Sequence, residues 1–313
     1  MKIRRLVECV MNVSEGQDHS KLEQIASRIR KVPEVFLLDY SADSAHNRTV
    51  FTFVGNPTAI CRAAFAATEE VIKLIDLRFH NGVHPRIGAV DVIPFVPLIG
   101  VTIEECTKIA HRLGEQIALQ LDVPVYFYGN AAMDLRRKNL LEIRREGFEK
   151  LRELIQSDPE KKPDFGLNRL HATAGAVSVG ARPPLIAYNI YLGTSDISVA
   201  RMIASVIRES GGGLKGVQAL GFFIDYKDLA QVSMNVSDYQ KTSLKTVYDR
   251  VRCKALEFHT DVHSAEIIGL VPQIALTCAS PQALGMETFR ASKILEKRVQ
   301  EVLGVTFGEE WLT

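Results

Sequence analysis

Residues 185–235 read LIAYNIYLGTSDISVARMIASVIRESGGGLKGVQALGFFIDYKDLAQVSMN, and the architecture follows from the pattern of this stretch. Three apolar runs rich in β-branched and aromatic residues predict strands, and the apolar spacing after Ser195 predicts a helix that ends at the glycines 211–213. One more helix and one more strand follow, so the order is β-α-β-β-α-β, the split βαβ arrangement. The predicted strands are 185–191, 216–224, 230–235 and 264–271, and the second helix is 245–257.

The first half of the chain repeats this order and extends it by a helix and a strand. Thr102 is a favourable N-cap for that added helix, with Glu104 and Glu105 in its first turn. We therefore expect an α+β protein of two α/β subdomains, residues 1–180 and 181–313. Further helices are expected at 135–156 and 287–303. The predicted strands here are 6–13, 35–39, 49–54, 89–98 and 123–128, and the predicted helices are 21–31, 58–75 and 102–121.

The composition is typical of a soluble globular protein. The chain has 313 residues, enough for about two domains, and 46% of them are apolar. Its formal net charge of +1 argues against dedicated binding of nucleic acid or of a membrane surface. We find no apolar run of membrane-spanning length and no signal peptide. The five cysteines are therefore expected to be free thiols in a cytoplasmic protein.

The densest polar cluster is the segment 80–88, HNGVHPRIG, between a predicted helix and a predicted strand. Its glycines and proline impose strong conformational control around two histidines, as in reactive loops held by rigid scaffolds. The spacing of His80 and His84 also resembles a pair of metal ligands, and His259 and His263 repeat it. Both pairs lack the Glu of the zinc-protease motif, so we expect no metal. A catalytic loop, a metal-dependent hydrolase and merely solvated histidines all remain open from the spacing alone.

Two other polar positions are costly to bury. Asn47 and Arg48 precede an apolar strand, and Asn189 interrupts the strand 186–191. Buried polar groups need hydrogen-bond partners, either from the protein or from a ligand. Bonding within the protein is the default interpretation of both positions.

Longer segments of the chain resemble a known family. They are LVECVMNVSEG, NRTVFTFVGNP, LIDLRFHNGVHPRIGAVDVIPFVPL, VPVYFYGNAA, PDFG, VGARPPLIAYNIYL, GVQALGFF and LAQVSMN, and they follow one another to about residue 275. Together they resemble glutamate formiminotransferase, the folate-dependent enzyme of histidine breakdown and one-carbon metabolism. The resemblance implies a homodimer whose subunits each hold a substrate tunnel between two subdomains of split βαβ type.

The resemblance also implies the site residues. The family's catalytic histidine directly precedes a proline and falls here on His84. Substrate carboxylates call for arginine side chains, and the candidates by position are Arg48, Arg86, Arg169 and Arg182, with Asn189 as a further substrate-binding residue. Ser41 stands where the family often has Asp. The folate-binding loop falls on Gly166, Leu167, Asn168, Arg169, Leu170, His171, Ala172, Thr173, Ala174 and Gly175.

The implied reaction moves the formimino group of N-formiminoglutamate to N5 of tetrahydrofolate, a co-substrate, without a metal. One imidazole can take the proton of N5 and deliver it to the departing glutamate nitrogen, because its ordinary pKa of about 6.5 suits both transfers. The expected partners are therefore these small molecules, with neither nucleic acid nor membrane. Two alternatives remain: a transferase of the same fold that uses N-formylglutamate, and a folate-binding protein without turnover.

Overall fold

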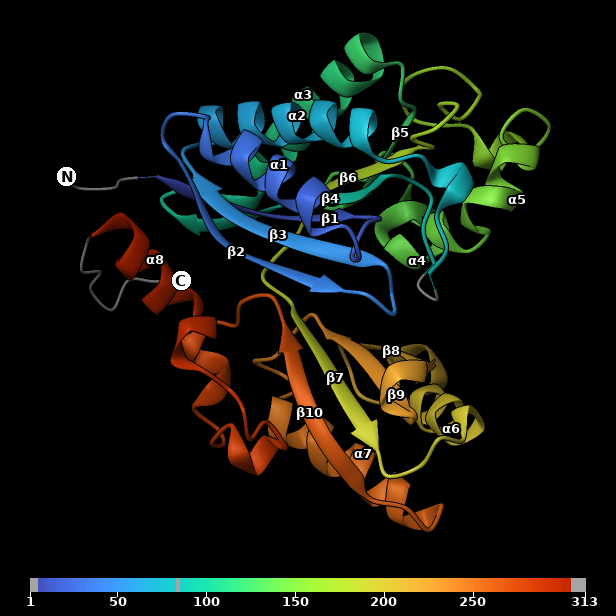
Figure 1. Cartoon of the computed structure of the whole chain (residues 1–313), viewed down its shortest axis with the longest axis vertical. Helices are drawn as coiled ribbons and strands as arrows, with labels where there is room; N and C mark the ends of the chain where they lie inside the picture. The colour runs from blue at the N-terminus through green and yellow to red at the C-terminus, as the bar shows by residue number, and fades with distance from the viewer. Residues whose placement is uncertain (1–4, 83–84, 305–313) are drawn as a thin grey trace. The chain divides into compact units, whose positions relative to one another are not determined.

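The computed structural model describes residues 5–82 and 85–304 (Figure 1). The chain forms two compact units, one that extends to Pro183 and one that comprises Pro184–Gly304. Each unit is built on its own β-sheet. Within the described residues, no helix is both long enough and apolar enough to cross a membrane.

The N-terminal unit has a six-stranded mixed sheet in the order β2-β3-β1-β4-β6-β5. The first four strands pair antiparallel, and β6 pairs parallel with both β4 and β5. Three helices, α1, α2 and α3, lie along one face of this sheet (Figure 1). The strands are β1 (Leu6–Val13), β2 (Val35–Asp43), β3 (Arg48–Gly55), β4 (Val90–Ile99), β5 (Val125–Gly129) and β6 (Val177–Ala181), and the helices are α1 (His19–Arg30), α2 (Pro57–Leu74) and α3 (Ile103–Leu121).

Side-chain caps fix where these helices begin. The carboxylate of Asp18 accepts hydrogen bonds from two backbone amides of the first turn of α1, and Asn56 does the same for α2. At α3, Thr102 and Glu105 form a reciprocal capping box, which confirms the predicted N-cap. Each capping residue stands immediately before its helix in the sequence, so each helix begins directly after the loop that leads into it.

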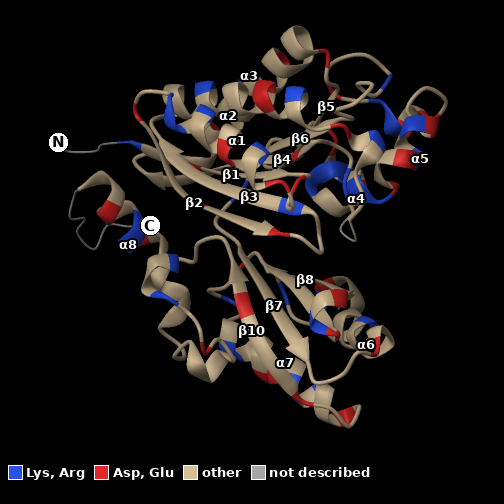
Figure 2. Ribbon diagram, viewed as in Figure 1, with Lys and Arg blue, Asp and Glu red and all other residues tan. Residues whose placement is uncertain are grey.

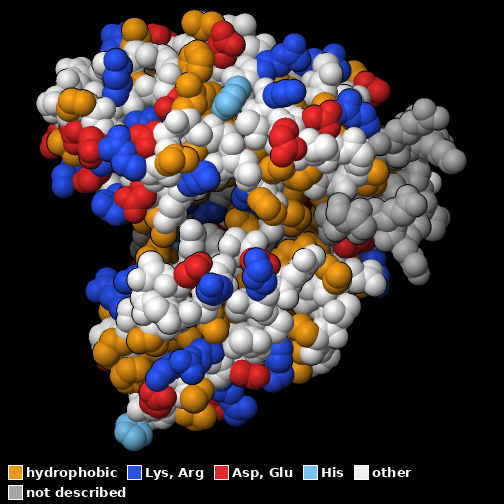
Figure 3. Space-filling view, turned by 180° about the vertical axis from the view of Figure 1, so that it is seen from behind, with side chains coloured by type: hydrophobic (Ala, Val, Ile, Leu, Met, Phe, Trp, Pro, Cys, Tyr) orange, Lys and Arg blue, Asp and Glu red, His pale blue; other side chains and the backbone are white. Residues whose placement is uncertain are grey.

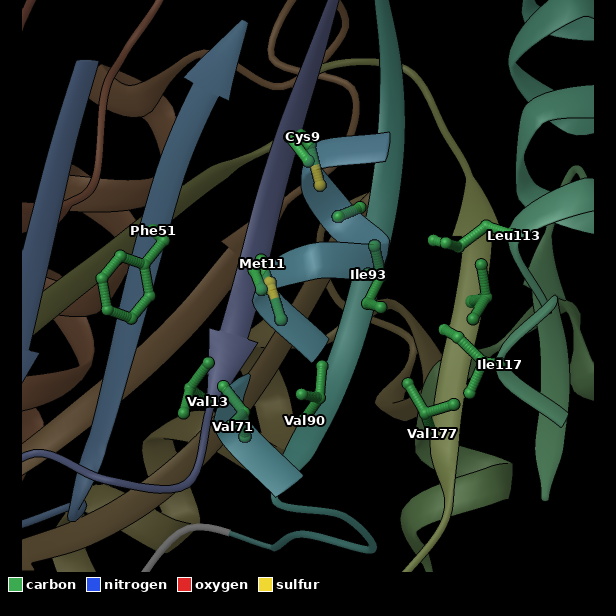
Figure 4. Close-up of a cluster of buried hydrophobic side chains, with 14 of the residues drawn as sticks. Cys9, Met11, Val13, Phe51, Val71, Val90, Ile93, Leu113, Ile117 and Val177 are labelled. Carbon is green, nitrogen blue, oxygen red and sulfur yellow. The ribbon is translucent and has the colours of Figure 1, made fainter. Parts of the chain in front are cut away.

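The core of the N-terminal unit lies between the sheet and these three helices. Alternate residues of β1, among them Cys9, Met11 and Val13, meet apolar side chains of α2 and of the neighbouring strands, including Phe51 (Figure 4). Full burial of each large apolar side chain stabilises the fold by roughly 1.5–3 kcal/mol. Burial also raises the pKa of Cys9, so this thiol keeps its proton and is a poor nucleophile.

Two shorter helices cover part of the opposite face. Here α4 (Leu140–Arg144) and α5 (Gly147–Leu154) pack side chains against Tyr126 and Tyr128 of β5. The prediction of one helix over 135–156 was therefore wrong. Asn139 caps α4, and Gly147 has a φ of +69°, which a helix interior does not accept, so the segment is broken in two.

The C-terminal unit has a four-stranded antiparallel sheet in the order β10-β7-β9-β8. Two helices, α6 and α7, supply the apolar core on one face of this sheet. Counted within each unit, both sheets place strands in the order fourth, first, third, second, so the predicted repeat of the split βαβ motif is confirmed at the level of topology. The elements are β7 (Ile186–Leu192), α6 (Ile197–Ile207), β8 (Val217–Ile224), β9 (Leu229–Val236), α7 (Leu244–Glu257) and β10 (Val262–Ile268).

The last helix is shorter than the sequence indicates. It was expected over 287–303, but α8 comprises only Leu295–Leu303. The reason is that the backbone around residue 294 pairs with Val271, which donates to Lys293 and accepts from Leu295.

Across the face drawn in Figure 3, acidic and basic side chains are interspersed, in keeping with the net charge of +1.

Candidate functional site

The segment HNGVHPRIG joins α2 to β4 in the N-terminal unit. Val83 and the predicted catalytic His84 lie outside the described residues, so the site is built from the residues on either side of them. We call residues 80–88 the histidine loop. Its described parts are anchored by hydrogen bonds to three other segments of the same unit.

The first anchor is the predicted folate-binding segment, Gly166–Gly175. The amide of Leu77 donates to the carbonyl of Thr173 at 2.8 Å, and the amide of Ala89 donates to the carbonyl of Ala174 at 2.9 Å. In the other direction, Ala176 donates to the carbonyl of Ile87 at 2.9 Å. These bonds involve residues that flank the loop or the segment, and an isolated β-bridge between Gly88 and Gly175 joins the two directly, backbone to backbone.

Two glycines make this approach possible. A Cβ atom added at Gly88 would lie 1.8 Å from the carbonyl oxygen of Ala176, and one added at Gly175 would lie 2.3 Å from that of Ile87. Gly175 also has a φ of +71°, in the left-handed region that favours glycine. Any side chain at either position would force the two segments apart.

The second anchor is the turn between β2 and β3. The imidazole Nε2 of His80 lies 2.8 Å from the carbonyl oxygen of Asn47, which can only accept, so Nε2 carries the proton. The Asn47 side chain donates to the carbonyl of Asn81 and accepts from the amide of Gly16, both at 2.9 Å. Burial lowers the pKa of His80, so its neutral form is the one that holds this turn.

The third anchor is Arg86. Its Nη2 donates to the carbonyl of His80 at 2.9 Å and to the carboxylate of Glu149 in α5 at 3.0 Å. The Arg86 side chain is only 13% exposed. This guanidinium therefore joins the two ends of the histidine loop to each other and to α5.

A cluster of charge adjoins the loop, and we call Arg48, Asp91 and Arg144 the buried triad, although only Asp91 and Arg144 are fully buried and Arg48 is half-buried. The Asp91 carboxylate pairs with Arg144 of α4 and accepts from the amide of Ile87 at 2.9 Å. Arg48, at the start of β3, donates to the side chain of Asn12. Burial and the charge of Arg144 lower the pKa of Arg48 to about 10, against the opposing effect of Asp91. Figure 2 shows the basic residues around α4.

Tyr128 of β5 connects the buried triad to Arg182. Burial raises the pKa of Tyr128, while the charges of Arg182 and Arg144 act to lower it, so both guanidinium groups lie near the phenol. The backbone of Arg182 donates to the carbonyl of Phe95 at 3.1 Å, which holds it at the end of β6. Two arginines, Arg144 and the predicted substrate-binding residue Arg182, therefore act on one tyrosine, and Arg48 is electrostatically linked to the first of them.

The folate-binding segment has a histidine of its own. Nδ1 of His171 accepts hydrogen bonds from the amides of Ala174 at 3.0 Å and Thr173 at 3.3 Å, so this nitrogen carries no proton. Burial lowers the pKa of His171, which favours the neutral form that these bonds require. Elsewhere in the segment, Leu167 is exposed, and Arg169 pairs on the surface with Asp122 at 3.4 Å.

Comparison with known proteins extends over almost the whole chain. Residues 6–182 match the model of the N-terminal subdomain of the formiminotransferase domain, and residues 187–298 match the model described as formiminotransferase domain. The chain belongs to the formiminotransferase family. The resemblance stated from the sequence segments is thereby confirmed.

Curated relatives cover the chain at similar identity. A protein of Streptococcus pyogenes serotype M1 named glutamate formimidoyltransferase is 39% identical, over 94% of this chain and 99% of its own length. One of the same name from Thermoplasma acidophilum is 41% identical, over 95% of this chain and 98% of its own. The formimidoyltransferase-cyclodeaminase of Rattus norvegicus is 42% identical, over 88% of this chain and 52% of its own.

The predicted site residues of this formiminotransferase-family chain fall into two groups. Arg48, Arg86, Arg182 and the segment 166–175 all lie in the N-terminal unit, with the described flanks of His84. Asn189 lies in the C-terminal unit, where its Nδ2 is 3.4 Å from Glu266. Their roles in binding stay predictions.

Sequence reasoning missed Asp91 and Arg144, the two residues that complete the buried triad. Asp91 is the only charged residue in the predicted strand 89–98, and that lone charge was the available signal. Among residues 5–82 and 85–304, no group of three or more His, Cys, Asp or Glu side chains is placed to hold a metal ion. His259 follows the end of α7 and His263 lies in β10, so they do not share a helix face.

Proposed function

We propose that this chain is a glutamate formimidoyltransferase, which transfers the formimino group of N-formimino-L-glutamate to N5 of tetrahydrofolate. The observation that carries the proposal is the backbone pairing of the histidine loop with the segment 166–175. A folate bound to that segment is held next to the loop of His84, and a close, fixed arrangement of reactants is what a group transfer needs. The relatives named for this activity support the assignment.

In the proposed reaction, N5 of tetrahydrofolate attacks the formimino carbon. The donor group is an amidine, protonated near neutral pH, and therefore already electrophilic. Attack forms a C–N bond and a tetrahedral intermediate in which N5 carries an excess proton. His84 takes that proton and delivers it to the glutamate nitrogen, and the bond from carbon to that nitrogen then breaks. Glutamate leaves as a neutral amine, and 5-formiminotetrahydrofolate remains.

The arginines account for binding of the acidic substrates. Glutamate and the folate tail carry carboxylates, whereas the chain has a net charge of only +1. Their attraction must therefore come from a local concentration of basic groups. Arg144 and Arg182 near Tyr128, with Arg48 near Arg144, supply one on the unit that carries the histidine loop.

A single assay tests the proposal against its alternatives. Purified protein is given tetrahydrofolate with either N-formiminoglutamate or N-formylglutamate, and the folate product is followed spectroscopically. We expect turnover with the formimino donor at a kcat/KM at least about tenfold higher than with the formyl donor, since only the formimino donor carries the amidinium. Preferred use of the formyl donor contradicts the assigned substrate, and folate binding without turnover contradicts the enzyme.

Two family features remain predictions for this chain. These are the homodimer and a substrate tunnel between the subdomains. Sedimentation equilibrium of the full chain tests the first. Hydrogen exchange tests the second, because a ligand in a tunnel should protect both the segment 166–175 and part of the C-terminal unit.

A further inference from the structure

The C-terminal sheet has a polar cluster on the face opposite α6 and α7. Tyr188 and Ile190 of β7 point into the apolar core, so the residues that alternate with them, Asn189 and Tyr191, lie on the other face. The strand register places Gln231 of β9 beside Tyr191, and Glu266 of β10 beside Asn189. We call Asn189, Tyr191, Gln231 and Glu266 the sheet cluster.

Hydrogen bonds orient the carboxylate of this cluster. The hydroxyl of Tyr191 donates to Oε1 of Glu266 at 2.5 Å, and Nδ2 of Asn189 lies 3.4 Å from the same oxygen. Burial and the adjacent carboxylate raise the pKa of Tyr191, so the phenol keeps its proton and remains the donor. Nζ of Lys227 lies 3.7 Å from the centre of the Tyr191 ring and holds the ring by a cation–π contact. Among the described residues, nothing donates to Oε2 of Glu266, which stays available to a ligand.

Gln231 is the second observation, independent of the first. It has no exposed surface, and neither the nitrogen nor the oxygen of its amide makes a hydrogen bond within the described chain. Its amide lies near enough to the Tyr191 hydroxyl to act on the pKa of that group, yet outside hydrogen-bond geometry. A buried amide without partners destabilises the ligand-free fold, so its presence calls for a reason other than packing.

The geometry points to a binding site in which Glu266, oriented by Tyr191 and Asn189, accepts the planar pair of N–H donors of an N–C–N group, with the Gln231 amide as a neighbouring partner. A carboxylate matches such a fork with two parallel hydrogen bonds, as in arginine–carboxylate pairs. The Gln231 amide has an NH2 donor and a carbonyl acceptor, neither of which is hydrogen bonded within the described residues. It can therefore bond to the donor and acceptor groups of the ligand beside that fork.

This inference rests on the proposed function for the identity of the ligand. Both proposed substrates contain an N–C–N fork: the 2-amino-pyrimidinone edge of the folate ring and the amidinium of the formimino donor. Aliphatic carboxylates, which the arginines of the N-terminal unit suit, have no such group and would be repelled by Glu266. The sheet cluster therefore recognises a nitrogen-rich end of one substrate, and the experiment decides which one.

The experiment measures direct binding of each substrate, without turnover, by titration calorimetry. The test variant is Glu266→Gln, which keeps the shape of the side chain and removes its charge. The control is Glu257→Gln, at an exposed carboxylate of α7 that pairs with Lys254. We expect Glu266→Gln to weaken the fork-bearing substrate by about 10- to 100-fold, the usual worth of hydrogen bonds to a charged group. The control should change affinity by less than about twofold.

Changes in the ligand show which of the two substrates binds at the sheet cluster. Folate is compared with an analogue whose 2-amino group is replaced by methyl, and N-formiminoglutamate with N-formylglutamate, which lacks the fork. If the folate ring binds here, the wild-type protein prefers folate to its analogue and Glu266→Gln loses that preference. If the formimino group binds here, the same loss of preference appears with the donor pair.

Gln231→Met guards against a purely structural role. It replaces an unpaired amide by an apolar chain of similar size, so we expect weaker binding of the same substrate with an unchanged or higher melting temperature. Affinities for both substrates that are indifferent to Glu266→Gln and Gln231→Met overturn the site. So does a general loss of affinity that tracks a fall in melting temperature. A wild-type protein that binds folate but lacks transferase activity refutes the proposed function and leaves this test intact.

Discussion

Replacement of Asp91 by asparagine should destabilise the N-terminal unit more than any single replacement of its arginine partner. Asp91 and Arg144 are paired with side chains only 3% and 8% exposed, and the half-buried Arg48 senses both charges. Asp91→Asn therefore leaves the buried Arg144 without its anion and removes a favourable charge near Arg48. Loss of one partner of a buried ion pair costs about 3–5 kcal/mol. At about 2–4 °C per kcal/mol for a unit of this size, the melting temperature should fall by roughly 6–20 °C.

The double variant tests the electrostatic origin of this cost. Arg144→Met removes the buried cation that has lost its anion, while asparagine at position 91 can still accept from the amide of Ile87. The double variant should therefore be more stable than Asp91→Asn alone, although it carries one substitution more. Urea unfolding of the four proteins of this cycle measures the effect. A cost below about 1 kcal/mol for Asp91→Asn, or a double variant less stable than both single variants, refutes the reasoning.

Three other predictions concern the proposed reaction. His84→Ala should lower kcat by roughly 10²–10⁴ with folding and folate binding intact. The control variant His263→Ala, at an exposed histidine, should leave kcat unchanged. Near-normal turnover of His84→Ala would remove His84 from the mechanism. The pKa of His171 in the folded protein lies below its unfolded value of about 6.5. The stability that the neutral imidazole contributes is therefore complete above the unfolded pKa, and it is lost as pH falls through the folded pKa. Folate affinity should therefore weaken as pH falls through the lowered, folded pKa of His171. His171→Asn, whose Oδ1 can replace Nδ1, should flatten that profile, whereas His171→Ala should weaken binding at every pH. Finally, KM for the donor should rise between low and moderate salt, since screening at 0.1 M acts over about 10 Å, and a KM indifferent to salt would argue against steering by the arginines.

The sequence predicted the local structure and the family much better than it predicted the hydrogen bonds and ion pairs that hold the site in place. Strand and helix periods identify both split βαβ motifs, because each depends on neighbours within a few residues. His80 shows the limit of this reasoning. The sequence offers for it only a metal-ligand spacing with His84, yet its imidazole holds the β2–β3 turn through Asn47 and its carbonyl binds Arg86. His80→Ala should therefore disturb the loop itself.

Long-range pairings explain the other gaps. Asp91 lies in an apolar strand and Arg144 in a segment that reads as a charged surface helix, so no local pattern connects them. Gln231 looks like an ordinary polar residue of an alternating strand, and only its complete burial singles it out. Such contacts depend on how distant segments meet in the fold, which periodicity and capping do not encode.

The glycine contact between residues 88 and 175 has a thermodynamic consequence. The two backbones touch with no side chain between them, so neither segment can shift without displacing the other. If folate binds the segment 166–175 as proposed, a shift that it causes there is passed to the histidine loop. By reciprocity, the factor by which folate changes the affinity for a donor bound at that loop equals the factor by which the donor changes the affinity for folate. We therefore expect the two proposed substrates to bind cooperatively, whichever of them binds first.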